Sequence, residues 1–317
     1  MPIKVMHIGL GPIGAAVVNQ VAKRKGLAIV GAVDIDPAKT GRDLGDVCSV
    51  GRKLKVKVAS DIAATIKSSR PDVAVLCTSS SLRKVVPEFE AVLKLKVPIV
   101  STTEELAYPV KSNAATAKKL DALAKRARVA VLGTGVNPGF VMDALPIALT
   151  GVCESVTAIE VDRIQDASIR RLPFQQKIGA GLTPEEFQAK VDDASVRHVG
   201  LAESITMIAD ALGWKLDRVT DEIEPRMAAT AVSSKFLTVP AGRVCGIIQD
   251  GVGYRKGVAV IKLHMEAYLG APESYDAVRI AGNPPLQMKL AGGVHGEVAT
   301  ASITVNSIPK ILQAPPR

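Results

Sequence analysis

The sequence predicts an α/β protein with two parts: a doubly wound parallel sheet, and then a second α+β domain built on an antiparallel sheet. Three observations predict this class. Short apolar runs alternate with amphipathic segments up to Gly133. A glycine-rich turn follows the first of these runs, at residues 9–14. Beyond Gly133, apolar and polar residues alternate with the period of two that is typical of half-buried strands.

The first part is expected to be a series of strands joined by helices. The intervening segments have apolar residues three and four positions apart, which indicates helices with one buried face. Strands that alternate with helices form parallel sheets covered on both faces. The expected strands are Ile3–Gly9, Leu27–Asp34, Leu54–Ala59, Val73–Cys77, Pro98–Ser101 and Val129–Gly133, and helices are expected within Ile13–Lys25, Leu82–Leu95 and Ser112–Arg126.

The second part has a different pattern. Residues Ser155–Ile164 and Val258–Tyr268 alternate like strands with one buried face, whereas Val199–Leu212 has the spacing of one amphipathic helix. The final segment Val298–Leu312 is free to return to the first part. The expected division of the chain is therefore residues 1–135, residues 136–297 and a C-terminal segment over residues 298–317.

Length and composition narrow the class of protein. The 317 residues suffice for two domains of ordinary size, and a hydrophobic content of 47% indicates a compact globular protein. The formal charge of +9 is spread over short clusters with few aromatic residues between them. This pattern is typical of solvated surfaces, so we expect no nucleic-acid partner. Charged residues interrupt every apolar run before the ~18 residues of a membrane span, so we expect no membrane partner.

The cysteines indicate a reducing compartment. The sequence has four, widely spaced, with no C-x-x-C pair and no grouping of cysteine with histidine that would hold a metal ion. The N-terminus does not have the pattern of a signal peptide. We therefore expect a cytoplasmic protein without a bound metal.

The most specific local pattern is G-x-G-x-x-G at residues 9–14. It lies between the expected first strand and first helix, where glycines let backbone N–H groups approach a pyrophosphate at the positive end of the helix. Pro12 is tolerated because its missing N–H would be unpaired at a helix start. The turn predicts a dinucleotide-binding domain of the Rossmann type. Its expected contacts are Gly9, Gly11, Pro12, Ile13 and Gly14.

Asp34 ends the second expected strand, 20 residues after Gly14. An acid at this position accepts hydrogen bonds from the adenosine ribose, and its charge repels the 2′-phosphate of NADP, so NAD is favoured. Lys39 and Arg42 lie just beyond it and could accept that phosphate instead. NADP therefore stays open, and Arg42 is counted among the expected cofactor contacts with Asp34.

The segment STTEELAYP, residues 101–109, places Glu104 and Glu105 directly after an apolar strand. Ligands of doubly wound sheets bind beyond the carboxyl ends of the strands, so one of these acids is expected to face a nicotinamide ring. Partial desolvation there would raise its pKa and suit it to proton transfer. The alternative is that both acids stabilise the start of a short helix, and spacing alone does not decide. Neighbouring strand ends supply the other expected cofactor contacts: Thr78, Ser79, Thr102 and Asn137.

Six motifs together carry a resemblance that extends over nearly the whole chain. They are GLGPIG, STTEEL, GTGVNPGFVMDALP (Gly133–Pro146), DRIQDASIRRLPFQQKIGAGLTPEEF (Asp162–Phe187), GLAESITMIADALGW (Gly200–Trp214) and GNPPLQMKLAGGVHGEVATASITVNSIP (Gly282–Pro309). With these motifs the sequence resembles the 2,4-diaminopentanoate dehydrogenase family. That family is similar in fold to dihydrodipicolinate reductase and includes the native amine dehydrogenases.

The resemblance implies an NAD(P)-dependent oxidoreductase of a C–N bond. Such an enzyme aminates a ketone or aldehyde reductively with ammonia, and in reverse deaminates an amine or a diamino acid such as 2,4-diaminopentanoate. The first glutamate of the family's T-x-E-E-L motif is its catalytic acid and base. It matches Glu104, so the resemblance selects Glu104 over Glu105. We expect a homodimer.

The second domain is expected to bind the substrate and to form the oligomer. Arg163 lies at the end of an alternating strand and can hold a substrate carboxylate with two hydrogen bonds. Gln165 follows on the same segment and is counted as a substrate contact. His264 can add a hydrogen bond or a charge from another strand. The structural alternatives are an arginine paired with an acid of the protein itself and a histidine that only stabilises its strand.

Three other functions stay open. The imine reductase of the dihydrodipicolinate reductase type has two histidines and a lysine before a P-S-G-T turn, and residues 163–180 offer no histidine pair. Cys77 could be the nucleophile of an acylating aldehyde dehydrogenase, although no nearby sequence suggests an activating base. The fold could also serve as a dinucleotide-sensing module without turnover, which has no need of an acid beside the nicotinamide.

Overall fold

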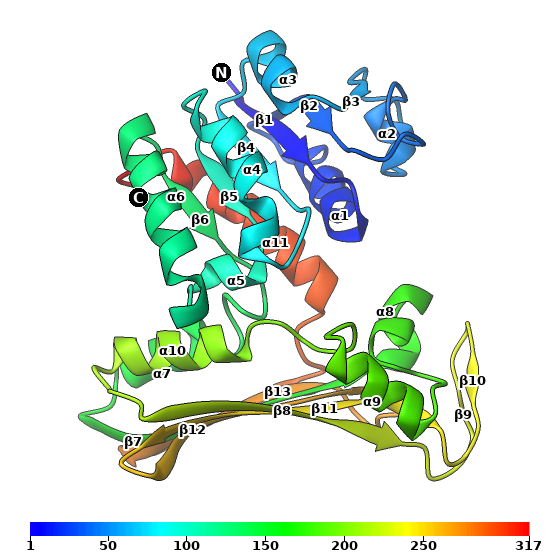
Figure 1. Ribbon diagram of the computed structural model, residues 1–317, viewed down its shortest axis with the longest axis vertical. Helices are drawn as coiled ribbons and strands as arrows, with labels where there is room; N and C mark the ends of the chain where they lie inside the picture. Colours follow the sequence, from blue (N-terminus) through cyan, green and yellow to red (C-terminus); the bar gives the residue numbers. More distant parts are fainter. Residues whose placement is uncertain (317) are drawn as a thin grey trace. The chain divides into compact units, whose positions relative to one another are not determined.

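The computed structural model describes residues 1–316, apart from the side chain of Lys111, and the chain forms two compact units (Figure 1). The first unit contains residues 1–139 and the segment that begins at His295, and the second is Phe140–Val294. These boundaries lie a few residues from those expected. Within residues 1–316, no helix combines the length and the apolar character needed to cross a membrane.

The first unit is built on six parallel strands in the order β3-β2-β1-β4-β5-β6. The order reverses between β1 and β4, where the two halves of a doubly wound sheet meet. This topology confirms the Rossmann-type class, and each strand overlaps its expected position. The strands are β1 Ile3–Ile8, β2 Leu27–Val33, β3 Val58–Ala59, β4 Val73–Leu76, β5 Ile99–Ser101 and β6 Val131–Gly133.

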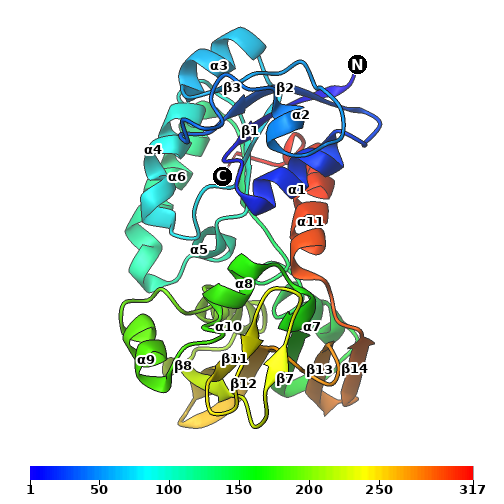
Figure 2. The same ribbon diagram turned by 90° about the vertical axis from the view of Figure 1, so that its right-hand side faces the viewer.

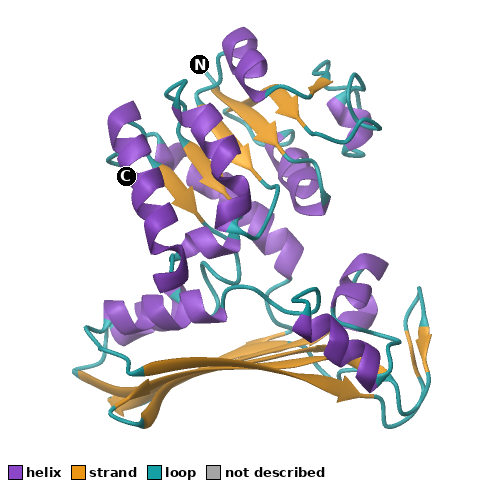
Figure 3. Ribbon diagram, in the orientation of Figure 1, coloured by secondary structure: helices purple, strands orange, loops and turns teal. Residues whose placement is uncertain are grey.

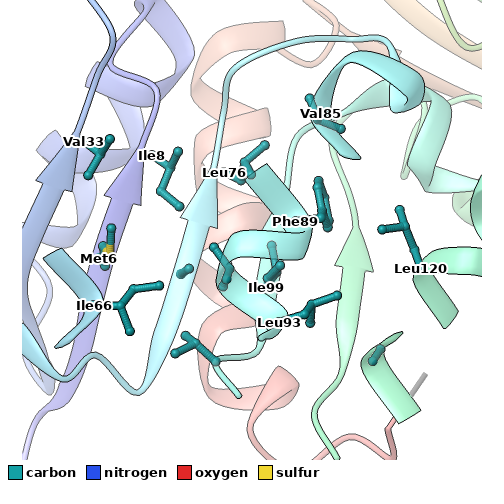
Figure 4. Packing of buried hydrophobic residues seen from close by; sticks show 14 of the residues in the cluster. Met6, Ile8, Val33, Ile66, Leu76, Val85, Phe89, Leu93, Ile99 and Leu120 are labelled. Atoms are coloured by element: carbon teal, nitrogen blue, oxygen red, sulfur yellow. The ribbon is translucent and has the colours of Figure 1, made fainter. Parts of the chain in front are cut away.

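Helices cover both faces of this sheet (Figure 3). On one face α3, α4 and α6 pack on the strands, and Phe89 of α4 lies in a core with Leu76, Ile99 and Leu120 (Figure 4). All four residues of β4 are buried, because a strand covered on both faces has no polar side. The helices of this unit are α1 Pro12–Val21, α2 Leu44–Val47, α3 Ile62–Ser69, α4 Leu82–Leu93, α5 Glu104–Ala107, the 3₁₀ turn η1 Lys111–Asn113, α6 Ala114–Ala127 and α11 Gly296–Ile311.

The last helix, α11, lies beside α1 on the other face of the same sheet (Figure 2). Val305 and Ile308 of α11 are buried in one apolar cluster with Val17 of α1. The side chain of Gln20 donates a hydrogen bond to Oγ of Ser302 at 3.0 Å. The first unit is therefore completed by the end of the chain.

The second unit is built on a sheet with the order β14-β13-β7-β12-β11-β8. All neighbours are antiparallel except β7 and β12, which run parallel, so the sheet is mixed where the sequence predicted an antiparallel one. A parallel pair needs a long crossover, and the helices between β7 and β12 provide it. The strands are β7 Ser155–Asp166, β8 Arg218–Met227, β11 Val244–Arg255, β12 Val258–Tyr268, β13 Tyr275–Asn283 and β14 Leu286–Ala291, with a short pair of β9 Val232–Ser233 and β10 Thr238–Val239.

The helices of the second unit lie over one face of its sheet (Figures 1 and 3). They are α7 Ala144–Thr150, the 3₁₀ turn η2 Ala167–Ile169, α8 Leu172–Lys177, α9 Pro184–Asp192 and α10 Leu201–Ala211. Gly251 of β11 lies directly under α10, since a Cβ atom there would come 3.1 Å from the Cβ of Leu201.

The opposite face of this sheet carries no helix of its own unit within the described chain. We call it the open face. Alternation along the strands and the register between them place the following side chains on it: Glu160, Asp162, Asp250, Val252, Tyr254, Lys262, His264, Glu266, Tyr268, Tyr275 and Arg279.

Candidate functional site

The glycine turn between β1 and α1 is closely packed at two of its three glycines. Gly9 has a φ of +84°, and a Cβ atom on it would come 2.6 Å from the carbonyl oxygen of Cys77. A Cβ atom on Gly14 would come 2.0 Å from the carbonyl oxygen of Gly9. Both positions therefore exclude any side chain, and they hold the start of α1 against the ends of β1 and β4.

Gly11 has a different environment. A Cβ atom on it would meet no protein atom within 4 Å, and its φ of −68° is open to every residue type. It caps α1, whose first turn also contains Pro12 and Ile13, and no side chain caps that helix. The fold itself does not require glycine here. A bare backbone at an uncapped helix start fits the approach of a pyrophosphate, so this turn fits a bound dinucleotide.

Asp34 follows β2 and is almost fully buried, at 8% exposure. Its Oδ2 accepts hydrogen bonds from the backbone N–H of Leu10 at 2.7 Å and from the ammonium of Lys39 at 2.9 Å. Its Oδ1 accepts the N–H of Asp36 at 2.9 Å. Burial raises the pKa of Asp34, but these hydrogen bonds together outweigh it and leave the pKa below the ordinary value, so the carboxylate is charged at neutral pH.

Arg42, the second expected phosphate ligand, lies on the surface near this acid. Its Nη1 donates to the carbonyl oxygen of Ala38 at 3.3 Å. Lys39, the other residue that the sequence offered as a ligand of the 2′-phosphate, contacts Asp34 directly. The structure therefore places a cation directly on the acid that was expected to reject the 2′-phosphate.

Glu104 and Glu105 are the first two residues of α5, at the carboxyl end of β5. Oε2 of Glu105 accepts the backbone N–H of Leu82 at 2.7 Å, which satisfies an N–H group at the start of α4. Ser81, the cap residue of α4, makes no side-chain capping hydrogen bond. Glu105 thus takes the place of a capping side chain at the start of α4.

The backbone before these acids is held by hydrogen bonds to the end of β4. Oγ of Ser101 donates to the carbonyl oxygen of Leu76 at 3.1 Å and accepts the N–H of Thr103 at 3.1 Å. Ser101 and Thr103 are fully buried, with 0% and 1% exposure. The N–H of Thr102 donates to the same carbonyl of Leu76 at 3.1 Å. The end of β5 is thereby joined to the end of β4, and α5 starts from a fixed position.

Cys77 directly follows β4. Burial raises the pKa of its thiol to about 11, a hydrogen bond with the side chain of Thr102 lowers it, and the charge of Glu104 raises it. The thiol stays protonated at neutral pH, which argues against the nucleophile of an acylating aldehyde dehydrogenase.

The end of β6 and the loop that follows it contact α5 and α11. A Cβ atom on Gly133 would come 2.5 Å from the carbonyl carbon of Leu106, so α5 rests directly on β6 and only glycine fits. Asn137 follows in the same loop and is buried, with 8% exposure. The loop is tied to α11 by a long hydrogen bond of 3.4 Å from the N–H of Val136 to Oγ1 of Thr300.

The loop after β4 holds Thr78 and Ser79. Oγ of Ser79 accepts the N–H of Ser81 at 3.2 Å. Oγ1 of Thr78 donates to Oε2 of Glu88 at 2.6 Å, and burial raises the pKa of that carboxyl. Sequence reasoning missed Glu88, because its partner lies ten positions away and no local spacing links the two. The structure thus brings the expected contacts Gly9, Gly11, Gly14, Thr78, Ser79, Thr102, Glu104 and Asn137 to one edge of one sheet.

Arg163 has a partner inside the second unit. Its Nη1 lies 2.6 Å from Oδ1 of Asp276, and its Nη2 donates to the carbonyl oxygen of Val294 at 2.9 Å. Both charged side chains are at most 3% exposed. Gln165 donates to the same carbonyl at 3.4 Å. This geometry favours the structural alternative for Arg163, an arginine paired with an acid of the protein itself.

His264 lies on the open face, and the register places Arg163 on the helix-covered face of the same sheet. Nδ1 of His264 is 2.7 Å from Asp250, and Nε2 is 3.0 Å from Glu266. The two side chains that the sequence predicts as substrate contacts therefore lie on different faces of the sheet within one chain. The physical reason is that alternate residues of a strand point to opposite faces, and the register assigns these two to different ones.

Comparison with known proteins gives consistent matches. Residues 140–317 match the 2,4-diaminopentanoate dehydrogenase C-terminal domain, and residues 3–133 match the dihydrodipicolinate reductase N-terminus. The 2,4-diaminopentanoate dehydrogenase of Acetoanaerobium sticklandii is 35% identical over 321 residues, which cover 99% of this chain and 91% of that protein. An amine dehydrogenase of Streptomyces virginiae is 25% identical over 236 residues, covering 72% and 64%. The structure of the amine dehydrogenase from Mycobacterium smegmatis has a TM-score of 0.87 at 25% identity, over 100% of this chain and 94% of the other.

Proposed function

We propose that this chain, which belongs to the 2,4-diaminopentanoate dehydrogenase family, is a nicotinamide-dependent dehydrogenase that oxidises and reduces the bond between a carbon atom and an amine nitrogen. In the reductive direction its substrates are ammonia and a small ketone or aldehyde. In the oxidative direction its substrate is an amine, or a diamino acid such as 2,4-diaminopentanoate. The similarity to two amine dehydrogenases supports this class of substrate.

Such a reaction needs protons to be moved at the substrate. In the oxidative direction the amine carbon loses a hydride and the nitrogen loses a proton, water adds to the resulting imine, and ammonia leaves. A bound nicotinamide supplies the acceptor of that hydride, or its donor in reverse. The protein must hold the reacting carbon in place and offer a group that accepts and returns protons.

The observation that carries the proposal is the difference between the two adjacent acids. Glu105 accepts the N–H of Leu82 at the start of α4, while Glu104 is the first residue of α5 at the carboxyl end of β5, where its charge raises the pKa of the Cys77 thiol. We propose that Glu104 accepts a proton from the attacking water or amine and returns it to the leaving group. The hydroxyl network of Ser101 and Thr103 supports this role, since a proton carrier must be held in position.

We propose that the dinucleotide lies at the glycine turn, with its pyrophosphate at Gly11 and the N–H groups of the first turn of α1. Asp34 then meets the adenosine ribose, and Thr78 and Ser79 border the nicotinamide half. The bare backbone at Gly11 supports this placement, because no contact of the fold explains that glycine.

The test is a substrate panel with the whole purified chain. NADH and NADPH oxidation is followed at high ammonium with 4-oxo acids, simple ketones and aldehydes, and NAD⁺ reduction is followed with the matching amines. We expect ammonium-dependent turnover with carbonyl compounds. Because Asp276 neutralises Arg163 internally, plain ketones are expected to react as well as acids of equal length. Carbonyl reduction that does not depend on ammonium would contradict the proposal.

We also propose that the chain forms a homodimer through the open face. Three of the chain's four tyrosines lie on the open face, and each has the cationic group of an arginine or lysine over its ring. Tyrosine and arginine are enriched at protein interfaces. The pairs are Arg218 on Tyr254 at 4.2 Å, Arg226 on Tyr268 at 4.8 Å and Lys289 on Tyr275 at 4.3 Å, measured to the ring centroid.

The partner on the open face is taken to be a second copy, because the face carries both signs of charge. Arg279 is paired with Asp162, and His264 is paired with Asp250. A two-fold axis can bring such a face against itself with acidic groups opposite basic ones. Sedimentation of Val252→Arg should give a monomer where the original chain gives a dimer, and Leu312→Arg is the control on an exposed position of the first unit. A dimer in Val252→Arg would show that the copies meet elsewhere.

A further inference from the structure

Lys39 is held against Asp34 by a defined turn. The carboxylate of Asp36 accepts the N–H of Ala38 at 2.9 Å, and the carbonyl of Asp36 accepts the N–H of Lys39 at 3.0 Å. The ammonium lies 2.9 Å from Asp34 and 3.7 Å from Asp36. The Lys39 side chain is 25% exposed, so this ion pair is partly shielded and still reachable from solvent. The position of the lysine therefore follows from backbone hydrogen bonds.

The pair changes what Asp34 does at the adenosine end of a cofactor. An uncompensated acid after β2 repels a 2′-phosphate, which is the usual basis for a preference for NAD. Here the nearest ammonium offsets that charge at hydrogen-bonding distance. An ammonium has three N–H donors, and its two acid neighbours use at most two of them. One donor remains for a ligand beside Asp34.

The two cations near this acid are not equivalent. Arg42 donates to Ala38 at 3.3 Å and does not contact Asp34, whereas Lys39 does. Burial lowers the pKa of Lys39, but its contacts with Asp34 and Asp36 outweigh this and raise it, so the lysine stays charged throughout the neutral range. Lys39 thus both cancels the repulsion and offers a donor, while Arg42 donates to the backbone of Ala38 and does not offset the charge of Asp34.

We infer that Lys39 determines how well the site accepts NADP in addition to NAD. With NAD, Lys39 stays on Asp34, and the ribose hydroxyls meet the acid. With NADP, one N–H of the ammonium donates to the 2′-phosphate. This inference rests on the proposed function only in requiring that a dinucleotide binds at the glycine turn.

The experiment measures binding, so that it does not depend on turnover. Dissociation constants of NADH and NADPH are obtained from nicotinamide fluorescence for the original chain and for Lys39→Met. Adenosine 2′,5′-bisphosphate and 5′-AMP serve as competitors that report the adenosine end alone. NADPH and the bisphosphate should bind at least about 10-fold more weakly to Lys39→Met, the scale of a lost charge-assisted hydrogen bond. NADH and 5′-AMP should bind equally well or more tightly, because Oδ2 of Asp34 loses a competitor.

Two further variants separate the lysine's contact from its charge. Lys125→Met removes another lysine paired with an aspartate, Asp121 of α6 at 2.7 Å, and should change neither cofactor's affinity. Lys39→Arg keeps the charge and should retain most of the NADPH affinity. Equal weakening of NADH and NADPH in Lys39→Met, or an equal effect of Lys125→Met, would overturn the inference.

The inference and the proposed function can fail separately. If the affinities follow Lys39 but no amine or ammonium-dependent turnover is found, the inference stands and the proposed reaction falls. If the original chain binds neither cofactor, the inference is overturned together with the cofactor site.

Discussion

The backbone N–H of Leu82 donates to the carboxylate of Glu105 at 2.7 Å, which binds the second of two adjacent acids to the start of α4. Glu104→Gln should therefore lose turnover by about 10²-fold or more, the usual scale for general acid and base catalysis, without a change in cofactor affinity. Glu105→Gln should keep most turnover and lose roughly 0.5–2 kcal/mol of unfolding free energy, as for a lost cap. Steady-state kinetics and urea denaturation of both variants measure these effects. An active Glu104→Gln beside an inactive Glu105→Gln would reverse the assignment.

Asp34→Ala should weaken NADH binding more than NADPH binding. The substitution removes the acceptor for the ribose hydroxyls and, at the same time, frees the ammonium of Lys39 from its ion pair, so that it can donate to the 2′-phosphate. Asp34→Asn is the matched variant, because it keeps the shape and an acceptor for the N–H groups of Leu10 or Asp36. Fluorescence titration with both cofactors gives the ratio of affinities. A parallel loss for NADH and NADPH would mean that Asp34 only organises the loop.

Gly11→Ala should fold normally and bind the dinucleotide poorly. A methyl group at this position meets no protein atom within 4 Å, whereas it occupies the backbone surface that a pyrophosphate approaches. Gly133→Ala is the contrasting variant, since its methyl group would come 2.5 Å from Leu106 and displace α5. Thermal melting and cofactor titration should therefore separate the two: binding fails first in Gly11→Ala, and stability fails in Gly133→Ala. Unchanged cofactor affinity in Gly11→Ala would place the pyrophosphate elsewhere.

Arg163→Ala should destabilise the second unit, because it leaves Asp276 buried without its partner. The loss expected for such a broken pair is about 3–5 kcal/mol. Arg163→Met combined with Asp276→Leu removes both charges and should recover much of the stability. Chemical denaturation measures the cost, and the KM values of a 4-oxo acid and a ketone of similar length measure the substrate effect. A rise in KM confined to the acid would restore Arg163 as a carboxylate ligand.

His264 should stabilise the protein more in acid than in alkali. Burial lowers its pKa, but the hydrogen bonds with Asp250 and Glu266 outweigh this and leave the pKa above the ordinary 6.5. A raised folded-state pKa contributes stability that is fully present below the unfolded pKa and is lost as the pH rises through the folded pKa. The stability difference between the original chain and His264→Gln should thus be larger at about pH 5.5 than at about pH 8.5. A difference that does not change with pH would mean that the imidazole is neutral throughout.

The elements that sequence predicts well are those with a local signal. The β1–α1 turn is fixed by the spacing of Gly9 and Gly14, and β4 and β5 are recognisable as short apolar runs. The position of the residues that follow β5 can also be predicted, because the carboxyl ends of parallel strands lie at one edge of the sheet. These inferences need only residues close together in the chain.

The contacts that sequence could not give join distant residues. Asp276 lies 113 positions from Arg163 in the sequence, and the two buried side chains lie on neighbouring strands of one sheet. His264 and Arg163 each lie on an alternating strand, but only the register of β7 with β12 tells which faces coincide. The parallel direction of that pair was itself unexpected. Side-chain roles in the second unit therefore depend on register, which periodicity within a strand does not specify.

The packing of α11 has a consequence for biosynthesis. During translation the first 139 residues leave the ribosome early, yet one face of their sheet is covered by Val305 and Ile308, which are made near the end. Domains usually fold in the order in which they are synthesised. Here the first unit stays unfinished, with an apolar face uncovered, until the second unit has been translated. While the second unit is being made, the nascent chain therefore carries an uncovered apolar face, which favours aggregation.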